Sequence, residues 1–210
     1  MLLLTNPQKI YIAISVFVVV TILIIIAVFI FRKIYVKKHY QEATYLRLAN
    51  LAKMNDFLLL NNLYIDYDDK HLGVINHLLI SKKYVYVIND FSLDGVISGD
   101  YRDRFLKHID KDGKVRNISN PLNYNINLVK RLNLTYNLDK TLVKGISVID
   151  DESEINIPNS SDQFFIVKRS ELNRLILNFD KEDVKPLKEE QIVSFINKLD
   201  KDNRRFKQGE

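Results

Sequence analysis

Hydrophobic and polar residues change their spacing several times along the chain, and the first pattern is an unbroken apolar run. Residues 10–31 contain no charged side chain and consist mainly of Ile, Val, Phe and Leu. A helix of these 22 residues, rising 1.5 Å per residue, could cross the ~30 Å hydrocarbon core of a bilayer. The pattern therefore predicts a transmembrane helix from Ile10 to Phe31, retained as an anchor because no small-residue cleavage site follows it.

Shorter patterns follow this run and alternate between helical and strand spacing. Apolar positions at helical spacing over 41–54 predict the first helix of a folded domain, and the apolar run over 57–65 predicts a strand. The later patterns predict a helix over 125–134, a strand over 141–149, a polar loop over 150–161, a strand over 163–168, two C-terminal helices and a frayed tail from Asp200. This succession is typical of an α/β domain.

Between these elements, two apolar segments predict a β-hairpin with a defined pairing. Residues 78–81 and 84–88 flank a pair of lysines, which marks the turn. If the turn is centred on the lysines, residues whose numbers sum to 165 face each other, so Asn76 lies opposite Asn89. Phe91 shares a face with Asn89 because side chains alternate along a strand. The three side chains are thus predicted to meet at one end of the hairpin.

The hairpin also carries a resemblance to a known family. Five short motifs follow one another in order: Ile75-Asn76-His77, Val87-Ile88-Asn89-Asp90-Phe91, Gly95-x-Ile97-x-Gly99, Asn120-Pro121-Leu122, and Leu142 to Val148. In this order and spacing the chain resembles the NERD (nuclease-related) domain over roughly residues 42–178. The resemblance implies a restriction-endonuclease-like α/β fold, with a mixed central sheet flanked by helices.

The chain departs from the family where the chemistry would occur. The resemblance implies an Asp, a Glu and a Lys that hold Mg²⁺ and position water, and these positions are Asn76, Asn89 and Phe91 here. Mg²⁺ favours charged oxygen ligands, so two amides and an apolar ring do not replace that set. We therefore expect a degenerate site with no catalytic residue, no metal and no cofactor.

An alternative is that acidic ligands have moved to other positions. Candidates are Glu42 in the first domain helix and Asp66 and Asp68 before the hairpin, which would make the protein an active Mg²⁺-dependent nuclease. Asp90 is not a candidate, because alternation turns it away from Asn89. By the same alternation His77 faces away from Asn76, and we expect a packed or surface histidine there.

The net charge of +5 and the pI near 9.2 are concentrated at one end of the chain. Residues 1–53 carry seven Lys or Arg and one acid, so the remaining 157 residues have a net charge of about −1. Four basic residues crowd the C-terminal flank of the apolar run: Arg32, Lys33, Lys37 and Lys38. The positive-inside rule then predicts a single-pass cell-membrane protein whose N-terminus is outside and whose C-terminal domain is cytoplasmic.

Composition excludes several other functions. The chain has no cysteine, so it has neither disulfides nor thiolate metal sites. Its four histidines lack the spacing of a zinc site, and no glycine-rich phosphate loop follows a strand. Few Gly and Pro with many Lys, Asn and Ile indicate a bacterial coding bias.

The predicted organisation is an anchor at 1–40, a NERD-like domain at 41–180, and a C-terminal helix and tail at 181–210. The leading function is a membrane-anchored, catalytically inactive binding module for nucleic acid or a protein. The alternatives are the nuclease with displaced acids and a membrane scaffold or assembly protein with no nucleic-acid role. The lipid bilayer is a predicted partner, and the sequence leaves the oligomeric state open.

Overall fold

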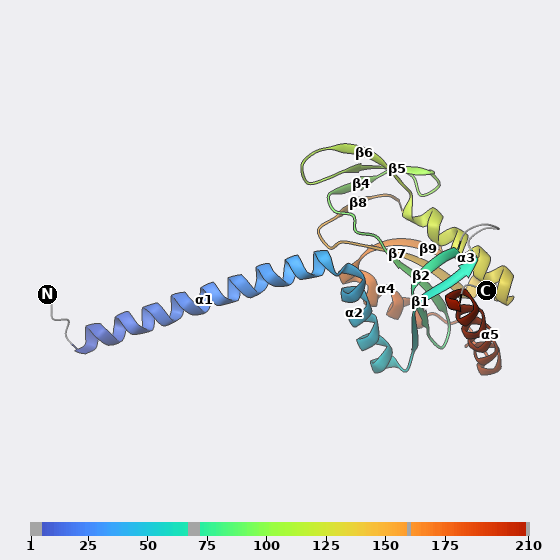
Figure 1. Ribbon diagram of the computed structural model, residues 1–210, viewed down its shortest axis with the longest axis horizontal. Coiled ribbons are helices and arrows are strands. Elements are labelled where there is room, and N and C mark those ends of the chain that lie inside the picture. Colours follow the sequence, from blue (N-terminus) through green and yellow to red (C-terminus); the bar gives the residue numbers. More distant parts are fainter. Residues whose placement is uncertain (1–5, 67–71, 159–160, 209–210) are drawn as a thin grey trace. The chain divides into compact units, whose positions relative to one another are not determined.

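The computed structural model describes residues 6–66, 72–158 and 161–208, and the chain divides into two compact units, Met1–His39 and Tyr40–Glu210 (Figure 1). The first unit contains helix α1, Asn6–Lys38. Within α1, the hydroxyl groups of Ser15 and Thr21 donate hydrogen bonds to backbone carbonyls four residues earlier, at 2.9 and 2.8 Å.

The predicted transmembrane span from Ile10 to Phe31 is corrected by the structure. Among the residues that the structure describes, no helix is both long enough and apolar enough to cross a membrane.

Several predictions depended on that span and are corrected with it. They are the membrane location and the orientation inferred from Arg32, Lys33, Lys37 and Lys38. The bilayer as a partner stays a prediction. The fold class that the structure supports is mixed α/β, without the predicted membrane helix.

The second unit is built on a five-stranded sheet with the order β1-β2-β3-β7-β9. Its strands are β1 Leu58–Asp66, β2 Leu72–Ile80, β3 Val85–Asp90, β7 Val143–Ile149 and β9 Phe164–Lys168. The first three strands are antiparallel, and β3, β7 and β9 run parallel to one another. The hairpin prediction is confirmed, because the pairs from His77↔Ile88 to Ile80↔Val85 all sum to 165.

Helices cover both faces of this sheet (Figure 1). Side chains of α2 (Tyr40–Asn55) and α4 (Leu172–Asp180) pack with Tyr86 and Ile88 on one face. Side chains of α3 (Pro121–Tyr136) and α5 (Glu189–Gln208) pack with Val85 and Val87 on the other. Every residue of β3 is buried, since alternate side chains enter opposite cores.

A second, four-stranded sheet has the order β6-β5-β4-β8. Its strands are β4 Val96–Ser98, β5 Phe105–Ile109, β6 Val115–Ser119 and β8 Glu154–Asn156. Ile97 and Leu106 on its inner face pack with Leu122 of α3 and Ile149 of β7. The sequence pattern did not predict this sheet and placed a polar loop over 150–161. The strands of the sheet escape the pattern because they have only three to five residues and bury one face only.

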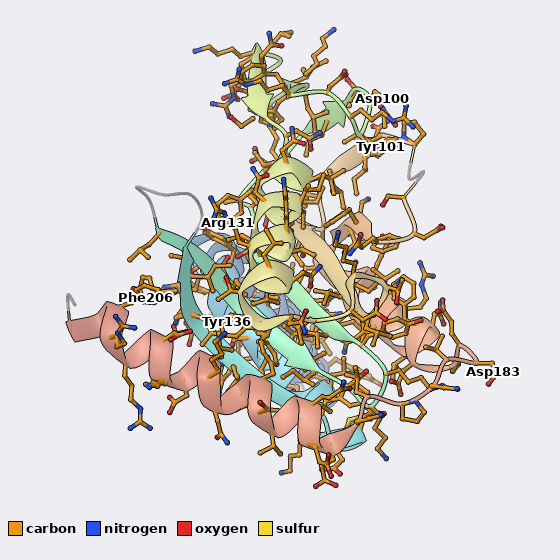
Figure 2. The ribbon with its side chains drawn as sticks, turned by 90° about the vertical axis from the view of Figure 1, so that its right-hand side faces the viewer. Asp100, Tyr101, Arg131, Tyr136, Asp183 and Phe206 are labelled. Carbon is orange, nitrogen blue, oxygen red and sulfur yellow. The ribbon has the colours of Figure 1, made fainter. Side chains whose placement is uncertain are left out.

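Helix α5 also differs from prediction, since it continues to Gln208 and residue 200 begins no frayed tail. Asn203 is buried, and its Oδ1 accepts a hydrogen bond from the backbone N of Tyr64 at 2.6 Å. The hydroxyl of Tyr136, at the end of α3, donates to Asp202 Oδ2 at 3.0 Å (Figure 2). These contacts with β1 and α3 hold the charged end of α5 in a helix.

Candidate functional site

The three predicted site positions lie together where β2 and β3 meet α3. Asn76 belongs to β2, Asn89 to β3, and Phe91 follows β3 directly. Asn89 is 1 % exposed, and Asn76 is partly buried. The geometry therefore brings together the positions that the sequence predicted as neighbours.

Asn76 and Asn89 are joined by a reciprocal pair of hydrogen bonds between side chains and backbone. The backbone N of Asn76 donates to Asn89 Oδ1 at 2.8 Å, and the backbone N of Asp90 donates to Asn76 Oδ1 at 2.9 Å. The two amide oxygens thus take the place of backbone acceptors just beyond the regular hairpin ladder. Both carbonyl oxygens that could ligate a cation are used within the protein.

The hydrogen bonds continue from Asn89 into α3 and β7. Asn89 Nδ2 donates to Asn125 Oδ1 at 2.6 Å, Asn125 Nδ2 donates to Ser147 Oγ at 2.8 Å, and the Ser147 hydroxyl donates to the Pro121 carbonyl at 3.1 Å. Asn125 and Ser147 are both fully buried. We call Asn76, Asn89, Asn125 and Ser147 the amide chain. It is uncharged, and each of its hydrogen bonds has a proper donor and acceptor.

Aromatic side chains close the other side of this position. The Phe91 ring lies edge-on to Tyr124 of α3, with the ring centroids 6.2 Å apart. The Tyr124 hydroxyl in turn donates to the carbonyl of Val74 and accepts from its backbone N, both at 3.0 Å. A ring packed in an aromatic pair therefore stands where the resemblance implies a lysine.

Of the three displaced acids, the structure describes the side chain of Glu42 alone, and this residue does not lie at the amide chain. Glu42 is an exposed residue of α2, which packs on the opposite face of the sheet from α3. The side chain of Asp66 and all of Asp68 lie outside the described residues. Among the side chains that are described, no three His, Cys, Asp or Glu residues are placed to hold a metal ion.

The opposite face of the hairpin holds a second polar cluster, which sequence reasoning missed. His77 Nε2 lies 2.9 Å from Asp90 Oδ2, and His77 Nδ1 lies 2.7 Å from Asn61 Oδ1. The other oxygen of Asp90 accepts a short hydrogen bond from the Thr44 hydroxyl. Thr44 also accepts from Arg169 Nε at 3.0 Å. We call four of these side chains the ionic cluster, and all four are almost completely buried: Thr44, His77, Asp90 and Arg169.

This ionic cluster is not arranged for hydrolysis. A nucleophile would have to lie beside the histidine, but Asn61 occupies one ring nitrogen and Asp90 the other. Arg169 Nη2 also donates to Asp150 Oδ1 at 3.1 Å, so positive and negative groups alternate along the cluster. Its chemistry is that of a buried support between α2, the sheet and the segment after β9. Side-chain alternation along the strands predicted that Asp90 and His77 face away from Asn76 and Asn89. The same alternation could also have predicted that Asp90 and His77 meet each other on the opposite face.

The remaining motif residues shape the backbone beside the site. Gly95 has φ +84°, and a side chain there would meet the carbonyl oxygen of Ile109. Gly99 also has a positive φ, and Ile97 between the two glycines is fully buried. Asn120 caps α3, as its Oδ1 accepts from the backbone N of Leu122 at 3.0 Å, with Pro121 as the first helical residue.

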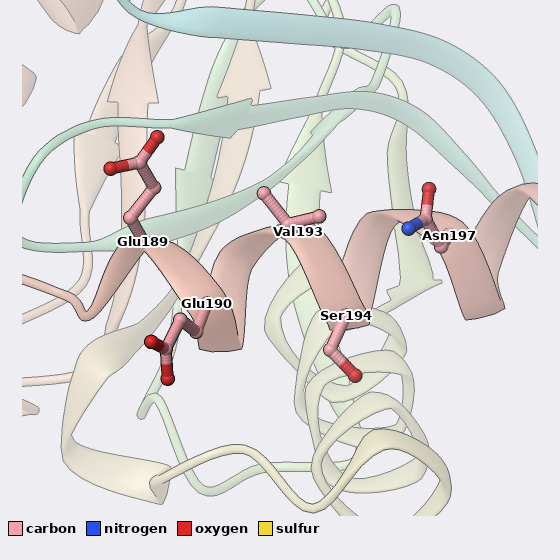
Figure 3. A pocket seen from close by; sticks show the side chains of 5 residues that line it. All are labelled: Glu189, Glu190, Val193, Ser194 and Asn197. Atoms are coloured by element: carbon pink, nitrogen blue, oxygen red, sulfur yellow. The ribbon is translucent and has the colours of Figure 1, made fainter.

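An open hollow of about 580 Å³ lies elsewhere, on the surface of α5 (Figure 3). It is lined by five residues of that helix: Glu189, Glu190, Val193, Ser194 and Asn197. None of the predicted site residues contributes to it.

Comparison with known proteins gives one match. A family model described as nuclease-related domain (NERD) matches residues 37–149, which is more than half of the chain. The matched segment includes the hairpin, the two glycines, the capped start of α3 and strand β7. Searches of curated proteins and of solved structures each found no match.

Proposed function

The chain belongs to the nuclease-related domain family, and from this premise we propose that it is a catalytically inactive member that acts by binding nucleic acid or a protein. The amide chain carries the proposal. Asn76 and Asn89 replace the acidic ligands, and both are engaged in hydrogen bonds within the protein.

Electrostatics supports inactivity at this position. A Mg²⁺ ion that enters a protein gives up part of its water shell and needs charged oxygen ligands in exchange. The amide chain offers neutral oxygens only. If one of these oxygens turned toward a cation, the backbone or side-chain donor that it now accepts from would lose its partner. A buried donor left unpaired costs about 1–3 kcal/mol.

The position also lacks the group that would help a water molecule attack. Phe91 has no proton to give or take, and its ring is packed against Tyr124. Asn125 and Ser147 fill the space between the hairpin and α3 with mutual hydrogen bonds. Charge developing on a phosphate would find no cation from these residues.

The nuclease with displaced acids receives no support from the described residues. It would require at least two carboxylates close to Asn76, whereas Glu42 is exposed on a helix that packs against the other face of the sheet. Mg²⁺ remains the relevant cofactor for that alternative alone.

The test combines metal binding with cleavage. The full chain is titrated with Mg²⁺ and Mn²⁺ by calorimetry and incubated with single- and double-stranded DNA and RNA. We expect no saturable metal binding and no metal-dependent cleavage. Cleavage that requires the metal and is abolished by Glu42→Gln, Asp66→Asn or Asp68→Asn would overturn the proposal and select the displaced-acid nuclease.

A further inference from the structure

The small sheet has one face packed on the domain and one face open to solvent. Along β5, Leu106 and His108 are fully buried, whereas Phe105 and Lys107 are exposed. Phe105 is 51 % exposed, although it belongs to the most apolar residue types. The open face therefore carries side chains that the fold itself does not use.

The strand register arranges these side chains in rows across the sheet. Lys107 pairs with Asn117 on β6 and with Ser98 on β4, and Ser98 pairs with Asn156 on β8. This polar row contains two amides, a hydroxyl and an ammonium group, and no carboxylate. Phe105 stands on the same face as Lys107, one alternation away along β5.

A parallel row is mostly apolar. Ile109 pairs with Val115 on β6 and with Val96 on β4, and Val96 pairs with Glu154 on β8. Val115 is 56 % exposed. The Glu154 carboxylate, the acid at the end of this row, already accepts a hydrogen bond from the Asn156 amide at 3.0 Å.

Acidic and basic residues around the open face differ in how they are used. Asp100, Asp103 and Asp110 accept hydrogen bonds from backbone N–H groups in the loops that shape the sheet. In contrast, Lys107 is exposed and forms no ion pair with any described residue. This cation is available to an anionic partner.

A second cation lies next to the exposed ring. The Arg104 guanidinium stands over Phe105, 5.3 Å from the ring centroid, and forms no ion pair with any residue that the structure describes. The nearby loop repeats this pairing, with Arg102 5.1 Å from the centroid of Tyr101 (Figure 2). Since Phe105 remains half exposed beside Arg104, part of its ring is open to a partner.

From these observations we propose that the open face of the small sheet binds a short stretch of single-stranded nucleic acid. Phe105 stacks on a base, the polar row meets base edges, and Arg104 and Lys107 contact phosphates. A single strand is required, because a duplex keeps its bases stacked on one another and offers no base face to the ring. A second copy of this face would bring like charges together, which disfavours self-association.

This inference rests on the proposed function, that the domain binds and does not cleave. Asn89 and Asn125 are buried between the hairpin and α3, so a nucleic acid does not reach these two amides. The inference therefore places binding on an exposed surface. The small sheet lies at one end of the domain, away from α5, and its rows are exposed (Figure 1).

The contacts predict measurable effects. Two phosphate contacts on a single strand give a slope of about −1.4 in a plot of log affinity against log salt concentration. Loss of one contact should change that slope by about 0.7. Loss of the stacking ring should weaken binding about tenfold, because stacking of one base on an aromatic side chain contributes about 1–3 kcal/mol.

The test is fluorescence anisotropy with the full chain and labelled 12-nucleotide RNA, DNA and matched duplexes, in the presence of EDTA. Without divalent metal, binding is measured apart from cleavage, so failure here is distinguishable from failure of the proposed inactivity. We expect single strands to bind more tightly than duplexes, Phe105→Ala to weaken binding about tenfold, and Lys107→Gln to flatten the salt slope.

Matched controls are available on other exposed surfaces. Tyr45→Ala removes an exposed aromatic ring from α2, and Lys130→Gln removes an exposed lysine from α3. We expect neither control to change affinity or salt slope. The inference is overturned if no single strand binds, if duplexes bind equally well, or if the two face variants bind as the controls do. Recovery of a protein partner whose binding is lost in the Phe105→Ala variant would assign the face to a protein and would also count against it.

Discussion

The buried ionic cluster on the α2 side of the sheet gives the sharpest stability prediction. The Asp90 side chain has no exposed surface and lies between the Thr44 hydroxyl and His77 Nε2. Asp90→Asn keeps the size and shape of the side chain, removes its charge, and replaces one acceptor oxygen with an NH₂ group. Either Thr44 or His77 must then change its hydrogen bonding.

The magnitude follows from which contacts survive. Thr44 can still donate to the Tyr40 carbonyl, 3.2 Å from its hydroxyl, so that side of the cluster can rearrange. The bond with His77 loses its ionised acceptor, and a hydrogen bond to a charged group contributes about 1.5–3 kcal/mol. Arg169 also loses a nearby counter-charge. We expect Asp90→Asn to lower the free energy of unfolding by about 2–3 kcal/mol, or Tm by about 5–10 °C.

Urea denaturation followed by circular dichroism measures this effect. Asp112→Asn is the matched control, because Asp112 is exposed in a turn and the same chemical change there should stay within about 0.5 kcal/mol. A double-mutant cycle with His77→Leu should give a coupling free energy of at least about 1 kcal/mol. Equal stability of Asp90→Asn and Asp112→Asn, or a coupling near zero, would refute this account of the cluster.

Two further predictions concern backbone conformation and pH. Gly95→Ala should lower the free energy of unfolding by at least about 3 kcal/mol, because its new Cβ would meet the Ile109 carbonyl. Gly113→Ala, with φ +80° and no atom within 4 Å of the new Cβ, should lower it by only about 1–2 kcal/mol. Similar thermal shifts for the two variants would contradict this expectation. Burial, reinforced by a hydrogen bond to Glu182, raises the pKa of Tyr84 to about 12. The stability that the neutral Tyr84 hydroxyl contributes is therefore complete below its ordinary pKa of 10 and is lost as the pH rises toward 12. In urea titrations between pH 10 and pH 12, Tyr84→Phe should lose less stability than the wild type.

Local patterns were sufficient to predict the hairpin. The register between β2 and β3 follows from a two-residue turn and a side-chain period of two, and the sum of 165 is confirmed. The helix predicted over 125–134 begins four residues earlier, at Pro121, where Asn120 of the family motif caps it. The family also followed from motif order, and the match over residues 37–149 confirms it.

Apolar length alone was not sufficient at the N-terminus. The run over 10–31 predicted a membrane span, and the described part of the chain contains no helix that meets the requirement for crossing. Short strands were also missed, because β4 and β8 have three residues each and their pairing partners lie far away in the sequence. The open face with Phe105 and Lys107 exists only once those strands pair.

The sequence by itself determined that Asn76, Asn89 and Phe91 stand where the resemblance implies two metal-binding acids and a lysine, since residue type and hairpin register are local properties. Only the tertiary structure decided what those residues do instead. Asn89 reaches Asn125 across 36 positions, and Asn125 reaches Ser147 across 22. Hydrogen bonds between such distant residues depend on how α3 packs on the sheet, and that packing is set by the whole core and not by any one segment.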